Sequence, residues 1–132
     1  MYLLPGSAFK LDNLKWTAAR LDELHNRSQH YYRSVKTLID AGVTILTGSD
    51  SGNYGTIQGY FVHREMIKLF QSGMSTWQAL QASTINAGQF LDKNFGVNQG
   101  DEANLVILQA SPIDDIRNTQ KIAFVIHHAK VI

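Results

Sequence analysis

The fold is decided by the stretch Ala41-Gly42-Val43-Thr44-Ile45-Leu46-Thr47-Gly48-Ser49-Asp50-Ser51-Gly52. Its residues 43–46 form a short apolar, β-branched run, which is typical of a buried parallel strand. A single carboxylate, Asp50, follows this run, and a glycine-rich loop continues to Gly59. In α/β folds, ligands bind just beyond the carboxyl ends of such strands. We therefore expect an α/β fold with Asp50 at a functional edge of its sheet.

Length and composition exclude several classes of protein. The chain has 132 residues, the size of one ordinary domain, and a net charge of +1, which favours neither nucleic acid nor an anionic membrane as a partner. No apolar run approaches 18 residues, and the first residues lack the charged start of a signal peptide. The absence of cysteine excludes disulfides and thiolate metal sites. The compartment stays undetermined, with the cytoplasm as the default.

The first two thirds of the chain have a helical pattern. Ser75 and Gln78 have the spacing of a capping box, which predicts that a helix begins there with Trp77 on its packed side. The other predicted helices cover residues 11–41, with a break near residues 26–28, then 59–72 and 86–91.

Short strands replace the helices after Gly96. The pattern predicts strands over residues 104–108, 121–126 and 131–132, with His127 and His128 in a hairpin. Three short strands do not form a stable sheet alone, because their edges and faces need cover. The chain therefore resembles a piece of a larger fold.

The histidines do not form a recognisable metal motif. A metal-dependent hydrolase needs several ligands that converge on one point. His25 and His30 do not share a helical face, and neighbouring side chains such as His127 and His128 point to opposite faces of a strand. Neither His-x-His nor His-Glu-x-x-His is present. We expect no complete mononuclear site within this chain.

Individual site residues have two interpretations when only the residues are considered. Asp50 is either a functional carboxylate or a turn residue that accepts hydrogen bonds from the following amides. His63 is more often structural than catalytic at such a position. Glu65 is predicted near the start of the second helix, where it would interact favourably with the helix dipole. The glycine-rich loop lacks both the Walker and the Gly-x-Gly-x-x-Gly patterns, which argues against a phosphate-binding loop. It is therefore either an active-site loop or an ordinary surface loop.

Several short motifs occur in one collinear order. They are Gly48-Ser49-Asp50-Ser51-Gly52, His63-Arg64-Glu65, Gly73-Met74-Ser75, Ala82-Ser83-Thr84-Ile85-Asn86-Ala87 and Gly100-Asp101-Glu102-Ala103-Asn104-Leu105-Val106-Ile107-Leu108. Together these motifs resemble the end of the barrel in the amidohydrolase superfamily, most closely its imidazolonepropionase-like and prolidase-like members. By this resemblance, residues 1–40 correspond to a seventh barrel strand and helix.

The resemblance implies a metal-dependent hydrolase of carbon–nitrogen bonds that acts on a small amide or peptide substrate. The implied fold is a (β/α)₈ (TIM) barrel, whose last one or two βα units occupy residues 1–92. Residues 93–132 then supply short strands of a composite β-sandwich. Asp50 is implied as the catalytic and metal-binding aspartate at the end of the eighth strand, and the expected metal is zinc. The implied substrate-binding residues are Asn53, Gln58 and His63.

The chain is much shorter than the fold that it resembles. A barrel of this kind usually takes about 250 residues, and at most two of its eight strands are present here, without the first-strand His-x-His. We therefore expect the chain alone to be inactive and to hold no metal by itself. It is expected to form a homo-oligomer or to need a missing N-terminal portion. The alternative is a non-catalytic, self-associating module.

Overall fold

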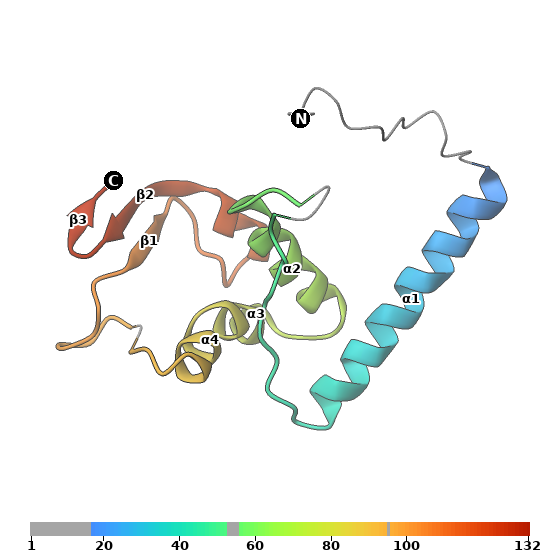
Figure 1. Ribbon diagram of the computed structural model, residues 1–132, viewed down its shortest axis with the longest axis horizontal. Helices are drawn as coiled ribbons and strands as arrows, with labels where there is room; N and C mark the ends of the chain where they lie inside the picture. Colours follow the sequence, from blue (N-terminus) through green and yellow to red (C-terminus); the bar gives the residue numbers. More distant parts are fainter. Residues whose placement is uncertain (1–16, 53–55, 95) are drawn as a thin grey trace. The chain divides into compact units, whose positions relative to one another are not determined.

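The computed structural model describes residues 17–52, 56–94 and 96–132 (Figure 1). By its contacts the chain divides into two compact units, residues 1–31 and 32–132, each described here by itself. The helices are α1 (Ala18–Asp40), α2 (Tyr60–Gln71), α3 (Thr76–Ser83), α4 (Ile85–Phe90) and the 3-10 helix η2 (Ile116–Gln120). The strands are β1 (Leu105–Leu108), β2 (Ile122–His127) and β3 (Lys130–Val131).

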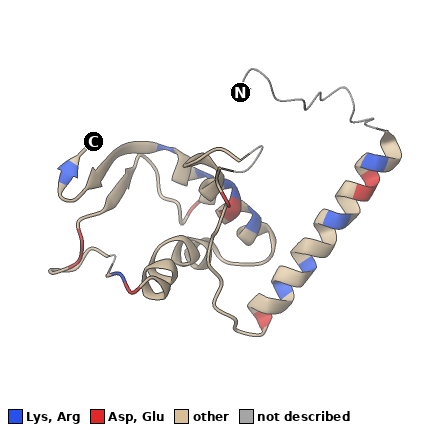
Figure 2. Cartoon of the chain, viewed as in Figure 1, with Lys and Arg blue, Asp and Glu red and all other residues tan. Residues whose placement is uncertain are grey.

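Helix α1 is continuous, so the predicted break near residues 26–28 is wrong. The polar residues there contain neither glycine nor proline, and the Ser28 hydroxyl donates to the carbonyl of His25 at 2.7 Å inside the helix. Charged residues of both signs lie along α1 (Figure 2). Lys36 and Asp40 form an ion pair at the end of the helix. The chain then turns at Gly42, whose φ of 74° is the left-handed conformation expected after a helix.

The hydrophobic core of the second unit lies between α2, α3 and η2. Met66 and Leu69 of α2 are buried, as their helical spacing predicts, whereas Phe70 is exposed. On α3 the fully buried residues are Ala79 and Ala82, and the predicted core residue Trp77 is 55% exposed. The helix lies against its neighbours through its small side chains, so Trp77 falls on the outer face. The remaining buried apolar residues are Met74 and Ile116.

The capping box at the start of α3 is confirmed. The Ser75 hydroxyl accepts from the amide of Gln78 at 3.2 Å, and the Gln78 side chain accepts from the amide of Ser75 at 2.8 Å. Because both amides would otherwise lack a partner within the helix, this reciprocal pair determines where α3 begins.

The three predicted C-terminal strands are confirmed as an antiparallel sheet in the order β1-β2-β3. A bulge interrupts the β1–β2 register between Ile107 and Leu108. The β2–β3 hairpin has a two-residue loop, in which both His128 and Ala129 have positive φ, as type I′ turns require. The side-chain oxygen of Asn104 accepts from the amide of His128 at 3.0 Å and so holds this turn.

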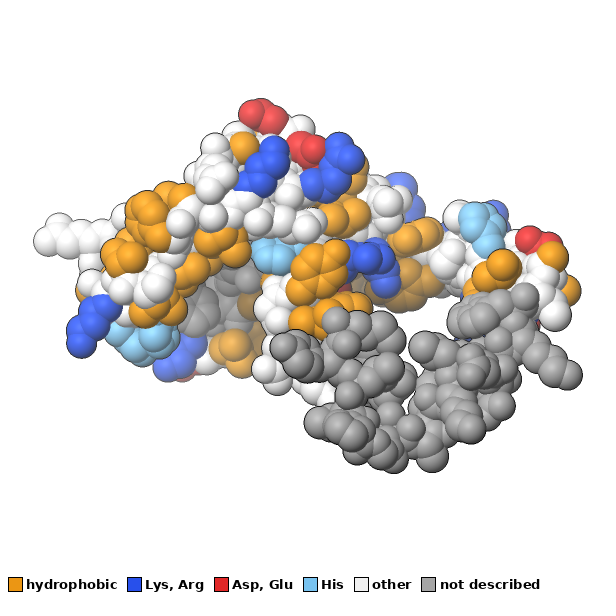
Figure 3. Space-filling model, turned by 90° about the horizontal axis from the view of Figure 1, so that it is seen from above, with side chains coloured by type: hydrophobic (Ala, Val, Ile, Leu, Met, Phe, Trp, Pro, Cys, Tyr) orange, Lys and Arg blue, Asp and Glu red, His pale blue; other side chains and the backbone are white. Residues whose placement is uncertain are grey.

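Both faces of this sheet carry exposed apolar side chains. Val106 is 54% exposed and Phe124 is 44% exposed. In the β1–β2 register Val106 pairs with Val125, and the next pair is Ile107 with Phe124, so the two exposed side chains point to opposite faces. Figure 3 shows hydrophobic side chains gathered over the strands. Nothing among the described residues covers this apolar surface fully.

The predicted strand over residues 43–46 is wrong for this chain. The segment has no strand partner among the described residues, and Val43 is 49% exposed. A strand needs neighbours that complete its hydrogen bonds, and the antiparallel sheet of β1–β3 lies elsewhere in the chain. Within the described parts, no helix combines the length and apolarity needed to cross a membrane.

Candidate functional site

Asp50 lies at the end of the segment that follows Gly42, in a strained backbone conformation. Its φ is 48°, in the left-handed region, and its side chain is exposed. The hydroxyl of Thr56 donates to the carbonyl of Asp50 at 3.3 Å, and the hydroxyls of Ser49 and Ser51 are 2.7 Å apart. Aspartate tolerates this conformation better than most residues, but it still costs free energy and persists where its surroundings fix it.

The segment before Asp50 is held by the helices α2, α3 and α4 of the second unit. The amide of Gly48 donates to Oε2 of Glu65 on α2 at 2.7 Å. The amide of Thr47 donates to the carbonyl of Ala82 on α3 at 3.2 Å. The side chain of Asn86 on α4 donates to the carbonyl of Ile45 at 3.4 Å. These bonds replace part of the pairing that neighbouring strands would give.

Glu65 therefore has a different role from the predicted one. It lies beyond the first turn of α2, so an interaction with the helix dipole does not account for it. Its partner is a backbone amide 17 residues earlier in the sequence. The only local indication in the sequence that Glu65 faces inward is its position between the core residues Val62 and Met66.

His63 is half-buried on α2, and its Nδ1 atom is buried without a hydrogen-bond partner among the described residues. Removal of the ring from water disfavours its charged form and lowers the pKa of His63 below its ordinary value. The imidazole is therefore held neutral over a wider pH range than in an unfolded chain.

We expect this burial to make stability depend on pH. The unfolded chain protonates His63 near its ordinary pKa of about 6.5, and the folded chain does so only at lower pH. As pH falls below about 6.5 the unfolded state binds more protons, so the free energy of unfolding decreases. Denaturant unfolding between pH 7 and 5 should show a shallower decrease for His63→Leu. A parental slope in His63→Leu would contradict the assignment.

The remaining predicted site residues are Gln58 and Asn53. Gln58 is exposed in the turn before α2, and Asn53 lies outside the described residues. His127 and His128 would point to opposite faces only if both were extended, but His128 has a left-handed backbone and the two ring centroids are 4.1 Å apart. Across residues 17–52, 56–94 and 96–132, no three His, Cys, Asp or Glu side chains converge in a way that could hold a metal ion.

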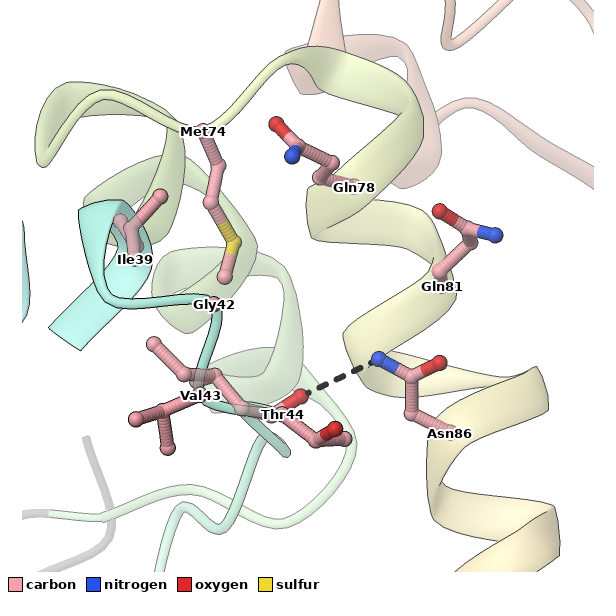
Figure 4. Close-up of a pocket in the computed structure, with 9 residues that line it drawn as sticks. Ile39, Gly42, Val43, Thr44, Met74, Gln78, Gln81 and Asn86 are labelled. Atoms are coloured by element: carbon pink, nitrogen blue, oxygen red, sulfur yellow. Dashed lines mark hydrogen bonds between the residues drawn. The ribbon is translucent and has the colours of Figure 1, made fainter.

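A cavity of about 230 Å³ lies beside the segment after α1. Figure 4 shows Met74 and Ile39 on one side and the amide side chains of Gln78, Gln81 and Asn86 on the other. The remaining lining residues are Gly42, Val43, Thr44 and Ile45. The lining contains no charged side chain and none of the predicted site residues. The cavity is thus separate from the candidate site at Asp50.

Solved structures share this fold. A predicted prolidase from Bifidobacterium longum superimposes with a TM-score of 0.75 at 27% identity, over 94% of this chain and 31% of that one. A Xaa-Pro dipeptidase with bound methionine gives 0.69 at 24% identity, over 76% and 25%. Phenylurea hydrolase B gives 0.64 at 25% identity, over 74% and 26%. This chain therefore spans between a quarter and a third of the length of these structures.

The sequence comparison assigns the family. No curated protein sequence matched the chain significantly. A sequence model of the amidohydrolase family, however, matches residues 4–132. That match covers nearly the whole sequence and confirms the resemblance that the ordered motifs indicate. This chain belongs to the amidohydrolase family.

Proposed function

We propose that this chain is the C-terminal part of a metal-dependent hydrolase of carbon–nitrogen bonds. Residues 1–92 form the end of a barrel in this proposal, and residues 93–132 form strands of a composite sandwich. Support comes from the family match over residues 4–132 and from the names of the similar structures, which include a dipeptidase and a phenylurea hydrolase.

The single observation that carries the proposal is the position of Asp50. It follows a segment that α2, α3 and α4 hold, its backbone is in the left-handed region, and the residue is exposed. An exposed carboxylate on a constrained backbone suits a group that must meet a reacting water at a defined point. In the proposal Asp50 accepts a proton from the attacking water, while Asn53, Gln58 and His63 belong to the substrate mouth.

A metal site is not complete in the part of the chain that the structure describes. A catalytic zinc site uses three protein ligands and keeps one position open, whereas Asp50 is a single carboxylate without two further converging ligands among these residues. In this proposal the described residues supply one metal ligand, Asp50, and the remaining ligands come from outside the chain. A divalent metal held in part by Asp50 in the complete protein would supply an activated water and would stabilise developing negative charge.

Hydrolysis assays test this proposal. The complete polypeptide that carries this chain, or the chain combined with an N-terminal barrel portion, is given a Xaa-Pro dipeptide and a phenylurea, with zinc present. We expect cleavage of at least one such amide or urea bond by the complete protein and none by the chain alone. Turnover by the purified chain alone would contradict the proposed division of the site.

A second candidate is a non-catalytic module that self-associates. It is favoured by the exposed apolar side chains on both faces of the β1–β3 sheet, because exposed patches of this kind often mark interfaces. Light scattering coupled to size-exclusion chromatography tests this second candidate. The module should form a stable oligomer, and a monomer would contradict it.

A further inference from the structure

The contact between Glu65 and Gly48 links the helical core directly to the loop that carries Asp50. The Gly48 amide donates to Oε2 of Glu65 at 2.7 Å, which is short for an N–H···O bond and typical of a charged acceptor. Glu65 is half-buried, and the next residue on α2, Met66, is part of the core. The loop is therefore tied to a rigid element two residues before Asp50.

The partner of Glu65 is informative because it is a backbone amide. The ion pairs in the described ranges include Arg20–Glu23, Lys36–Asp40 and Asp115–Arg117, and none of these involves Glu65. A carboxylate that only neutralised a nearby charge would face a basic side chain. Glu65 instead accepts from one main-chain N–H group, and such a bond fixes the position and direction of the peptide that it binds.

Asp50 needs such a restraint. A non-glycine residue with a φ of 48° is held there by its surroundings, since the unrestrained chain prefers negative φ. On the downstream side, the restraint is the Thr56 hydroxyl, which donates to the Asp50 carbonyl at 3.3 Å from within the loop itself. On the upstream side, the Glu65 bond at Gly48 lies nearer to Asp50 than the bonds of Thr47 to Ala82 and of Ile45 to Asn86.

We infer that Glu65 is a positioning residue that fixes the loop backbone and, through it, the direction of the Asp50 carboxylate. The inference rests on the proposed role of Asp50 in hydrolysis. Glu65 does not touch the reacting atoms in this account. Its carboxylate acts through the Gly48 peptide, so its removal should leave the Asp50 side chain present but wrongly directed.

Nuclear magnetic resonance of the full chain labelled with ¹⁵N-glycine tests the contact itself. The chain has ten glycines, so the spectrum is simple. Gly48→Ala assigns the Gly48 resonance, because a methyl group there meets no atom within 4 Å and the residue has no positive φ. A proton held by an anionic acceptor resonates downfield. We expect the Gly48 resonance to move upfield in Glu65→Gln and further in Glu65→Ala.

Two controls separate this effect from unfolding. Glu23→Gln makes the same chemical change on an exposed part of α1 and should not move Gly48. The resonances of Gly73 and the buried Gly88 report whether the second unit remains folded. If Glu65→Ala unfolds the chain, the isosteric Glu65→Gln decides the question. A Gly48 resonance that is unchanged in a folded Glu65 variant would overturn the inference.

Kinetics of the complete protein test the consequence for Asp50. A misplacement of about 1 Å can cost about 100-fold in rate, so we expect Glu65→Ala to lower kcat by about that factor with little change in KM. Glu65→Gln keeps an acceptor oxygen and should recover part of the loss. If Asp50→Asn abolishes activity but Glu65→Ala leaves it unchanged, the positioning role of Glu65 is contradicted and the proposed function is not. If Asp50→Asn leaves activity intact, the proposed function fails instead, whatever the Gly48 resonance shows.

Discussion

Asp50→Asn should lower hydrolysis by the complete protein by about 10²–10⁴-fold, the usual contribution of a general base. Asparagine keeps the size of the side chain and tolerates the left-handed backbone that the structure gives Asp50. The substitution therefore removes the proton acceptor while the size of the side chain and the backbone conformation are kept. Steady-state assays with the amide or urea substrate that the parent protein cleaves give the measurement.

Asp92→Asn is the matched control for this experiment. Asp92 is also an exposed aspartate with positive φ, here 53°, and it follows α4 outside the candidate site. The same chemical change in the same class of backbone conformation should leave the rate unchanged. An Asp50→Asn protein with parental activity would show that the carboxylate is a turn residue and not a catalytic group.

Met66→Ala should destabilise the second unit by about 2–5 kcal/mol, the usual cost of truncating a buried methionine. Met66 is 5% exposed and lies in the core formed by α2, α3 and η2. The loss combines the transfer free energy of the removed atoms with the cavity that they leave. Urea unfolding followed by circular dichroism measures it, provided that the m-value is unchanged.

Trp77→Ala is the contrasting variant. Trp77 is the larger side chain, but it is 55% exposed, so we expect a change of only about 0.5 kcal/mol. A cost for Trp77→Ala that equals or exceeds the cost for Met66→Ala would contradict the core described here. Comparison at several protein concentrations shows whether association of the chain contributes to either value, since binding between folded copies raises apparent stability.

Features with a local cause could be predicted from the sequence. The capping box at Ser75 depends on residues three apart, and α2 repeats its apolar side chains with the helical period. The three C-terminal strands and the hairpin between β2 and β3 also follow from short-range patterns. The ordered motifs identified the family, which the match over residues 4–132 confirms.

Features that depend on distant neighbours could not be predicted in the same way. Trp77 was assigned to the core by its hydrophobicity, but close packing at Ala79 and Ala82 decides which face of α3 is buried. The apolar run at residues 43–46 predicts a strand. A strand needs neighbouring strands to pair with, and none of the described residues pairs with this run. The Glu65–Gly48 bond spans 17 residues, so the sequence around Glu65 does not indicate which group it binds.

The candidate site is less complete than the fold. The structure places Asp50, Gln58 and His63 but brings no metal-binding group together in the parts of the chain that it describes, and Asn53 lies outside them. Side chains that meet at a barrel mouth come from strands far apart in sequence. A chain that spans 25–31% of the similar structures therefore supplies only some of them in our proposal.

Calorimetric titration of zinc into the purified chain tests the central claim most directly, because it measures whether one chain holds a complete site. Our account predicts no tight stoichiometric binding and the same weak heat for the parent chain and for Asp50→Asn. One tightly bound zinc per chain in a monomeric sample, lost on Asp50→Asn, would contradict the account.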